Sequence, residues 1–330
     1  MAGRRAKIHA VGTYVPERIV TNDDLSLNLD TSDEWISTRT GIRERRIASD
    51  AEAASDLGAG AARRALKAAA VSPDQLDLII TASLSPDMLF PATASLISGL
   101  IGAGAAAAFD LSAACTGFIY ALAVGESFIV SGRAEKVLVI GADAVSKMID
   151  WSDRGTAVLF GDAAGAVLLG PAAEGEEGII GFDLGNDPAG AGELSLPAGG
   201  SRLPASEETV AGGQHFLRMN GPEVFRFATR IVAASSRRVV EQHGLRMEDI
   251  DIFIPHQANI RIIDAAARKL RIAPEKVFSN IERYGNTSCA SIPLCLDEAE
   301  RQGRLKRGDL VLMTGFGAGL SWGSCIVRWQ

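Results

Sequence analysis

The chain has few of the residues that build metal sites. It contains only four cysteines and four histidines among 330 residues, and neither type forms a CxxC, HExxH or similar metal-binding pattern. We therefore expect no metal site. The cysteine spacing does not indicate a disulfide framework either, so a reducing, cytoplasmic setting is expected.

An excess of basic residues is also missing. The 40 acidic residues outnumber the 33 lysines and arginines, which gives a formal net charge of −7. Nucleic-acid-binding domains usually carry a basic surface. Nucleic acid is therefore not an expected partner.

Long uninterrupted apolar runs are absent as well. Residues 88–109 are uncharged for long enough to span a bilayer, but one proline and three glycines interrupt them. The first residues, MAGRRAKIHAVG, carry charge without an apolar segment. Neither a signal peptide nor a membrane partner is expected.

What the chain does have is short apolar runs that alternate with helical patterns. This order predicts βαβ units and a mainly parallel sheet. The predicted strands are residues 7–15, 76–82, 108–111, 136–142, 179–184, 250–254, 310–315 and 323–329. The predicted longer helices are 55–70, 92–100, 115–131, 222–243, 259–270 and 288–301. Residues 156–160 and 164–169 are interpreted as a hairpin, and 188–213 as an irregular excursion.

An internal duplication is visible at an offset of 174 residues. LDLIITAS at 76–83 resembles IDIFIPHQ at 250–257, and VLVIGA at 137–142 resembles VLMTGF at 311–316. We interpret the chain as two similar halves, 1–172 and 173–330, with a site between them.

Cys115 is the first candidate for chemistry. It follows a strand-like run and precedes a helical pattern, so its thiol is expected at a helix N-terminus, where the helix dipole favours thiolate. A depressed thiol pKa and a nucleophilic role follow from that position. A small buried hydrophobe is the alternative. The offset of 174 relates Cys115 to Cys289.

His256 and Asn286 are candidates for supporting groups. His256 follows a buried strand directly, at the end where open α/β sheets bind ligands. Asn286 lies in YGNTSCAS, and the glycine-rich GFGAGLSWG begins at 315. Cysteine, histidine and asparagine together can perform acyl transfer. A structural histidine, a capping asparagine and a tightly packed turn are the respective alternatives.

Together these motifs carry a resemblance. From about Ile8 to the C-terminus the chain resembles the β-ketoacyl-[acyl-carrier-protein] synthase III family, the initiating condensing enzymes of type II fatty-acid synthesis. The matching segments are DTSDEWISTRTGIRERRI, FDLSAACTGF, DRGTAVLFGDAAGAVLL, PHQANIRII, GNTSCASIP and GFGAGLSWG. The resemblance implies an α/β thiolase-like fold, with two duplicated halves whose mainly parallel mixed sheets pack in αβαβα layers.

The resemblance also implies a reaction. Cys115 would take an acyl group from acyl-CoA, and His256 and Asn286 would hold the thioester carbonyl of malonyl-carrier protein while CO₂ leaves. The resulting carbanion would attack the acyl-cysteine to give 3-oxoacyl-carrier protein. The implied oxyanion hole is formed by the backbone N–H groups of Cys115 and Ala318. The family motif has three glycines where this chain has GAG, and the alanine is expected to be tolerated with a negative φ.

Further positions are assigned by the resemblance. Residues matching the CoA path are Trp35, Arg39, Arg154, Phe225 and Asn259. Trp35 and Arg154 would sandwich the adenine, although 30–47 taken alone favours a solvated loop with one anchoring tryptophan. The implied acyl pocket consists of Phe90, Phe160, Leu217, Met219 and Phe316. Phe90 would enter the partner subunit's pocket, so a homodimer is expected. No cofactor is expected, because acyl-CoA is a substrate.

A basic helix follows His256. It carries Arg261, Arg268 and Lys269, and the two arginines are seven residues apart, hence on one face. A solvated face is the usual interpretation of such charges. Its position and the resemblance favour a patch that binds an acidic acyl carrier protein. The role of a second basic cluster, RERR at 43–46, is left open.

Two other functions are considered. A ketosynthase or acyltransferase of polyketide-type metabolism could share the fold, and a non-catalytic partner subunit would be expected to lack Cys115. The acyl primer is left open.

Overall fold

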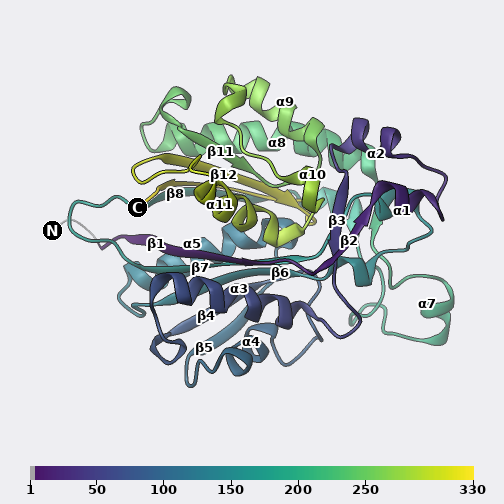
Figure 1. Ribbon diagram of the computed structural model, residues 1–330, viewed down its shortest axis with the longest axis horizontal. Helices are drawn as coiled ribbons and strands as arrows, with labels where there is room; N and C mark the ends of the chain where they lie inside the picture. Colours follow the sequence, from purple (N-terminus) through teal and green to yellow (C-terminus); the bar gives the residue numbers. More distant parts are fainter. Residues whose placement is uncertain (1–3) are drawn as a thin grey trace.

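The computed structural model describes residues 4–330, which form five alternating layers of helices and sheets (Figure 1). Helices α8 (Gly221–Gln242) and α9 (Ile260–Leu270) cover one side, and α3 (Ala54–Ala69) and α4 (Thr93–Ile101) cover the other. Helices α5 (Gly117–Val130) and α11 (Ser291–Arg301) lie between the two sheets. This αβαβα layering confirms the predicted fold class, but the two sheets are mixed rather than mainly parallel, since three of their seven strand pairs are parallel.

The first sheet has the strand order β1-β7-β6-β4-β5. Its strands are β1 (Ala6–Tyr14), β4 (Leu78–Ala82), β5 (Ala107–Leu111), β6 (Val137–Asp143) and β7 (Ala163–Pro171). Strand β4 runs parallel to β5 and β6, whereas β7 is antiparallel to both β1 and β6. All residues of β4 and β6 are buried, as expected for strands covered by helices on both faces.

The second sheet repeats the first without a β5 equivalent. Its order is β11-β12-β13-β8, which corresponds to β4-β6-β7-β1, and its strands are β8 (Ile179–Asn186), β11 (Ile252–Pro255), β12 (Leu310–Gly317) and β13 (Ser321–Arg328). The pair Leu78–Val137 recurs as Ile252–Val311, with both partners 174 residues further along the chain. The offset seen in the sequence is therefore also the offset of the strand register. The proposed division at 172/173 lies in the connection from β7 to β8 and stays a prediction.

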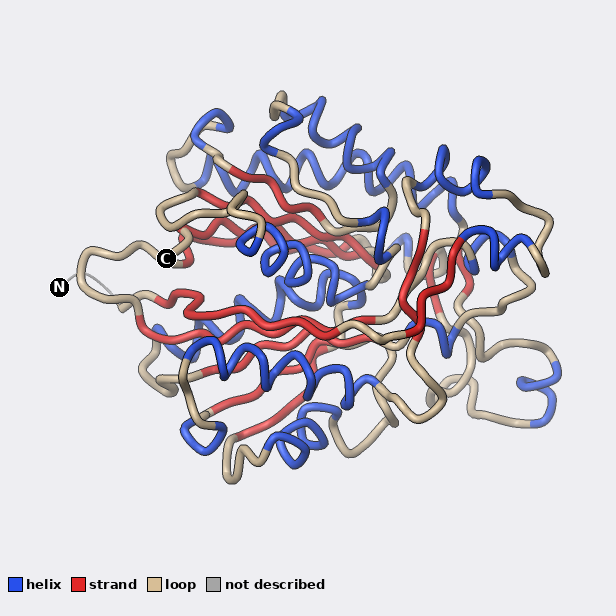
Figure 2. The backbone as a smooth tube through the Cα atoms, viewed as in Figure 1, coloured by secondary structure: helices blue, strands red, loops and turns tan. Residues whose placement is uncertain are grey.

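The smaller elements surround one end of this core (Figure 2). They are the strands β2 (Arg18–Thr21), β3 (Glu44–Ile47), β9 (Leu194–Ser195) and β10 (Arg218–Met219), and the helices α1 (Asn22–Ser26), α2 (Asp33–Thr40), α6 (Arg154–Ala157), α7 (Glu207–Ala211) and α10 (Ile281–Tyr284). Two 3₁₀ turns, η2 (Ala114–Thr116) and η7 (Ser288–Ala290), lead into α5 and α11. No helix within 4–330 is long and apolar enough to cross a membrane.

The interpretation of residues 30–47 as a loop is wrong. The Ser32 hydroxyl accepts a hydrogen bond from the Trp35 backbone N–H at 3.1 Å and caps α2. Gly41, with a φ of 81°, ends the helix. Strand β3 then pairs with β2. The many polar residues misled the interpretation, because capping residues and loop residues are the same types.

The hairpin expected around residue 161 is also wrong. Residues 154–157 form helix α6, whose N-cap Asp153 accepts a hydrogen bond from the Gly155 backbone N–H at 2.8 Å. Strand β7 pairs with β1 and β6 instead. Phe160 bridges to Asn286, which brings two predicted site residues together.

Candidate active site

Cys115 lies in turn η2 at the start of α5, where the sequence predicts it. Ala114, with a φ of 45°, bends the chain just before it. The thiol is buried, with 5 % of the residue exposed. Strand β12 passes close by: a Cβ built on Gly317 would lie 2.8 Å from the Cys115 backbone nitrogen. Glycine is therefore required for this approach.

His256 follows β11 directly. Its backbone N–H donates to the Thr314 carbonyl at 2.8 Å, and its Nδ1 lies 2.6 Å from the Ser291 hydroxyl oxygen. The Phe316 ring packs edge-on against the imidazole, 5.4 Å between centroids. Burial lowers the pKa of His256 to about 3, so the imidazole is neutral at physiological pH. With Nδ1 bonded to Ser291, Nε2 is the nitrogen available to a ligand.

Asn286 is held by its backbone on both sides. Its N–H donates to the Leu159 carbonyl at 2.8 Å, and its carbonyl accepts from Gly161 N–H at 3.0 Å. The side-chain Oδ1 accepts from the Ser288 backbone N–H at 2.9 Å. Because Oδ1 is used in this way, the Nδ2 hydrogens are the ones left to donate to a ligand.

One cavity of about 290 Å³ joins these three side chains. Of the predicted residues it is lined by Cys115, Phe160, Leu217, Met219, Phe225, His256, Asn259, Asn286, Phe316 and Ala318. Its remaining wall is mostly apolar and includes Leu84, Met148, Val224 and Ile262, none of which the sequence singled out. The arrangement is a mostly apolar pocket whose lining includes a thiol, a neutral imidazole and an amide.

The prediction of a depressed thiol pKa is wrong. Burial raises the pKa of Cys115 to about 12, and the negative charge of Asp143 adds to the rise, while hydrogen bonds from the Ser288 hydroxyl and the Cys115 backbone oppose it. Desolvation disfavours a buried thiolate more than one turn of backbone N–H groups stabilises it. The resting thiol is therefore protonated.

The backbone at Ala318 meets the condition set by the sequence, a negative φ. Positive φ values among the non-glycine residues of 4–330 occur at four positions, and Ala318 is not one of them. Its methyl group is thus accommodated without left-handed backbone strain. Within the same described range, no group of three or more His, Cys, Asp or Glu side chains is arranged to hold a metal ion.

Two family profiles match this chain. A family profile described as 3-oxoacyl-[acyl-carrier-protein (ACP)] synthase III matches residues 109–188, and the profile of its C-terminal part matches 240–329. The β-ketoacyl-[acyl-carrier-protein] synthase III of Symbiobacterium thermophilum is 56% identical over 326 residues, covering 99% of this chain and 98% of the relative. The chain belongs to the β-ketoacyl-[acyl-carrier-protein] synthase III family. The family and the condensing-enzyme function predicted from the motifs are confirmed, and the protein is an acyltransferase-type enzyme that initiates fatty-acid synthesis.

Solved structures of related proteins share the whole fold. The 3-oxoacyl-(acyl carrier protein) synthase III of Pseudomonas aeruginosa PAO1 is 42% identical, with a TM-score of 0.92 over 99% of this chain and 98% of that chain. The priming β-ketosynthase from the R1128 polyketide pathway is 37% identical, with a TM-score of 0.92 over 99% and 97%.

The residues that the family motif assigns to the adenine end do not line this cavity. Trp35 is half-buried on α2, and the guanidinium carbons of Arg39 and Arg154 lie 4.5 and 4.7 Å from its ring centroid. Arg154 also donates to the Asp30 carbonyl at 2.7 Å. A purine between two stacked faces needs about 7 Å. The space between the Trp35 ring and the Arg154 guanidinium is therefore too narrow for a purine in this structure.

The other predicted synthase III positions are on the surface. Arg261, Arg268 and Lys269 are exposed on α9, and the Arg261 guanidinium lies over Phe225, 5.7 Å from its centroid, at the cavity wall. Phe90 is 83% exposed and does not line this chain's cavity.

Two supporting residues of the synthase III site were missed in the sequence. Ser291 fixes His256, and Asp143, which is fully buried, accepts from the Leu84 N–H at 2.8 Å and the Cys289 N–H at 3.1 Å. Asp143 thereby ties a cavity-wall loop to turn η7. An acid that ends the buried run KVLVIGAD is the sequence signal that could have identified it.

Proposed function

We propose that Cys115, His256 and Asn286 carry out the two half-reactions of this condensing enzyme with acyl-CoA and malonyl-carrier protein. In the first, Cys115 Sγ attacks the thioester carbonyl of acyl-CoA and the C–S bond to CoA breaks. The thiol proton passes to the CoA sulfur, so CoA leaves as a thiol and an acyl-cysteine forms. The proposal is carried by the cavity that brings the three side chains together from separate segments.

The second half-reaction uses the neutral imidazole and the amide. In this proposal the Ser291 hydroxyl donates to Nδ1 across their 2.6 Å contact, and the imidazole proton is on Nε2. His256 Nε2–H and Asn286 Nδ2–H then both donate to the thioester carbonyl of the malonyl group. The bond to the carboxylate breaks, CO₂ leaves, and the electron pair becomes an enolate held by these donors. The enolate carbon attacks the acyl carbonyl, and Cys115 is released. The backbone N–H groups of Cys115 and Ala318 stabilise the oxyanion of the acyl-transfer steps.

The remaining predicted residues bind the CoA and carrier-protein parts of the substrates in this proposal. Trp35 and Arg154 hold the adenine of CoA, with Arg39 alongside, and Phe225 and Asn259 line the pantetheine path into the cavity. Arg261, Arg268 and Lys269 dock the acidic carrier protein. The exposure of all three side chains on α9, with Arg261 over Phe225 at the cavity wall, supports that assignment.

A homodimer completes the acyl pocket in this proposal. Leu89 and Phe90 are 79% and 83% exposed, and β5 forms an edge of the first sheet. Phe90 enters the pocket of the partner subunit. Analytical ultracentrifugation should give a dimer, and Phe90→Ala should change chain-length preference.

The four cysteines are free in the structure, which supports a reducing cytoplasmic location.

The decisive experiment separates the half-reactions. Acylation of the protein by acyl-CoA is followed by intact-mass spectrometry, and CO₂ release from malonyl-carrier protein is followed separately. We expect His256→Ala and Asn286→Ala to slow CO₂ release by about 10²-fold while acylation continues. CO₂ release at the wild-type rate in both variants would refute the proposed roles.

A second candidate is the priming step of polyketide synthesis, because the R1128 priming ketosynthase shares this fold at 37% identity. Incubation with a mixture of acyl-CoAs followed by mass spectrometry of the acyl-enzyme identifies the primer. Both fatty-acid and polyketide initiators predict acylation at Cys115, and the preferred acyl group and carrier protein distinguish them.

A further inference from the structure

The basic cluster RERR at 43–46 contains the most deeply buried cation of the described chain. Arg45, on β3, is 0% exposed. No salt bridge to it is found within residues 4–330. Burial lowers its pKa to about 10, so it keeps its charge at neutral pH. Burying a charge without an ion-pair partner costs desolvation free energy, so we expect Arg45 to have a function that offsets this cost.

The guanidinium binds three oxygens from two separate segments of the chain, residues 20–22 and Val158. Nη1 donates to the Val20 carbonyl at 3.2 Å and to Asn22 Oδ1 at 2.9 Å, and Nη2 donates to the Val158 carbonyl at 2.8 Å. A planar fork of donors can serve oxygens that converge from different directions, which the compact ammonium of lysine cannot reproduce. Arg45 therefore fixes the Val158 end of the cavity wall to the β2–β3 ribbon.

The segment anchored at Val158 is the one that holds Asn286. Leu159 accepts the Asn286 N–H, and Gly161 donates to the Asn286 carbonyl. The stem of Arg45 packs on the same place: Cβ atoms built on Gly161 and Gly285 would lie 3.1 and 3.5 Å from Arg45 Cβ. Arg45 thus contacts the residues that flank both Phe160 and Asn286.

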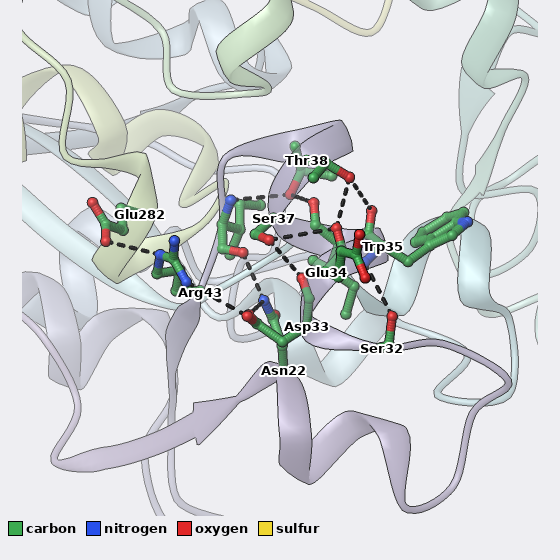
Figure 3. Close-up of polar contacts among 12 residues, drawn as sticks. Asn22, Ser32, Asp33, Glu34, Trp35, Ser37, Thr38, Arg43 and Glu282 are labelled. Atoms are coloured by element: carbon green, nitrogen blue, oxygen red, sulfur yellow. Dashed lines mark hydrogen bonds and ion pairs between the residues drawn. The ribbon is translucent and has the colours of Figure 1, made fainter.

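Other contacts of the RERR cluster also support the segment that holds Asn286. Arg43 N–H donates to the Glu282 carbonyl at 2.9 Å, and its guanidinium lies 3.2 Å from the Glu282 carboxylate. Glu282 belongs to α10, which ends just before Gly285. Figure 3 shows Arg43 reaching from Glu282 on one side to Asp33 on the other, beside Asn22. Asn22 in turn donates to Asp33 Oδ1 at 2.8 Å.

We propose that Arg45 is a positioning residue for the decarboxylation step, because it sets the place of Asn286 through Val158 and the Phe160–Asn286 bridge. The inference rests on the proposed role of Asn286. It predicts a selective defect: Cys115 lies on a different turn, and none of the three Arg45 hydrogen bonds reaches that turn, so changes that displace Asn286 should impair acylation much less than CO₂ release.

The variants are Arg45→Lys, which keeps the charge but not the fork, and Arg45→Met, which keeps much of the stem. Arg46→Lys and Arg46→Met are matched controls on the same strand, since the Arg46 side chain donates to the Pro16 and Glu17 carbonyls instead. Thermal midpoints establish which variants are folded, and Arg45→Lys carries the test if Arg45→Met is not folded.

We expect CO₂ release from malonyl-carrier protein to fall about 10²-fold in the Arg45 variants, as for a misplacement of about 1 Å. Acylation by acyl-CoA should stay within about threefold of wild type, and the Arg46 variants should match wild type in both assays. A double-mutant cycle with Asn286→Ala then decides the route. If Arg45 acts through Asn286, adding Arg45→Lys to Asn286→Ala should cause no further loss.

The contrary outcomes are distinct. Equal losses of acylation and CO₂ release, or multiplying losses in the double variant, overturn the inference while leaving the role of Asn286 intact. Normal CO₂ release in Asn286→Ala alone overturns the proposed function, and this inference with it.

Discussion

The two halves of the molecule build the same turn and use it differently. Ala114 and Ser288 occupy corresponding positions with φ values of 45° and 50°, and each is followed by a cysteine and then a helix. Cys115 lines the cavity, whereas Cys289 points its Sγ at the Ala114 carbonyl, 2.9 Å away. The duplicated backbone supplies the position, and access to the cavity decides which thiol can meet a substrate.

The other chemical groups are divided between the halves. His256 corresponds to Ala82, and Asn286 precedes the second turn, so the second half supplies hydrogen-bond donors and the first supplies the thiol. The two halves also differ in how tightly the corresponding glycines Gly141 and Gly315 are packed. A Cβ built on Gly141 of β6 would lie 2.3 Å from the Cys289 carbonyl oxygen, whereas at the corresponding Gly315 the nearest atom is 3.5 Å away.

The largest expected effect comes from removing each of the two thiols in turn. Cys115→Ala should abolish acyl-enzyme formation from acyl-CoA, because no other thiol lines the cavity within 4–330. Cys289→Ala should acylate within a few-fold of wild type. Intact-mass spectrometry measures both. Acylation of the Cys115→Ala protein at Cys289 would show that the two turns are chemically interchangeable.

A pair of glycine substitutions tests the packing difference. Gly141→Ala should destabilise the fold by about 3 kcal/mol, because its Cβ would collide with backbone that cannot rotate away. Gly315→Ala meets ordinary van der Waals distances and should cost less than about 1 kcal/mol. Denaturant unfolding of both variants gives the difference. Equal losses would mean that the two half-interfaces are equally tight.

The next largest expected effect is the pH dependence of the rate at which Cys115 is alkylated. Since only the thiolate reacts with iodoacetamide, a pKa raised to about 12 predicts a Cys115 alkylation rate that still rises tenfold per pH unit near pH 9. The rate should not level off near about 8.5, the value for a free thiol. Cys115→Ala provides the background from the other cysteines. A plateau below pH 8.5 would restore the depressed pKa expected from the helix start.

His256 should give the smallest change with pH. Its pKa is lowered from 6.5 to about 3, so it is neutral at pH 7 and stays neutral as the pH falls to 5. The NMR shift of its imidazole, identified by its loss in His256→Gln, should therefore remain constant over that range. The rate of CO₂ release should show no acidic limb from this residue. A titration centred near pH 6 would mean that the imidazole is solvated.

Much of the architecture was predictable because it follows from local patterns. Buried apolar runs and amphipathic segments identified the strands and helices, and the offset of 174 located both turns. Cys115, His256 and Asn286 could be selected from motif and resemblance, and the cavity contains all three. Their catalytic roles stay predictions.

The sign of the Cys115 pKa shift was not predictable. The helix start is visible in the sequence, but the depth of burial, which outweighs it, depends on how β12 and η7 close around the thiol. Arg45 and Ser291 were hidden for the same reason. Each acts through contacts with segments more than 30 residues away. The helix α6 was missed because four residues with an aspartate cap resemble a turn.

The layer between the two sheets has a consequence for unfolding. Phe118 of α5 and Ile292 of α11 belong to a single buried cluster that also includes Val139 of the first sheet and Met313 of the second. If either half unfolded, the apolar residues of the other half would lose their packing contacts in that cluster. We therefore expect one cooperative calorimetric transition rather than two. A fragment of residues 4–172 should not fold independently.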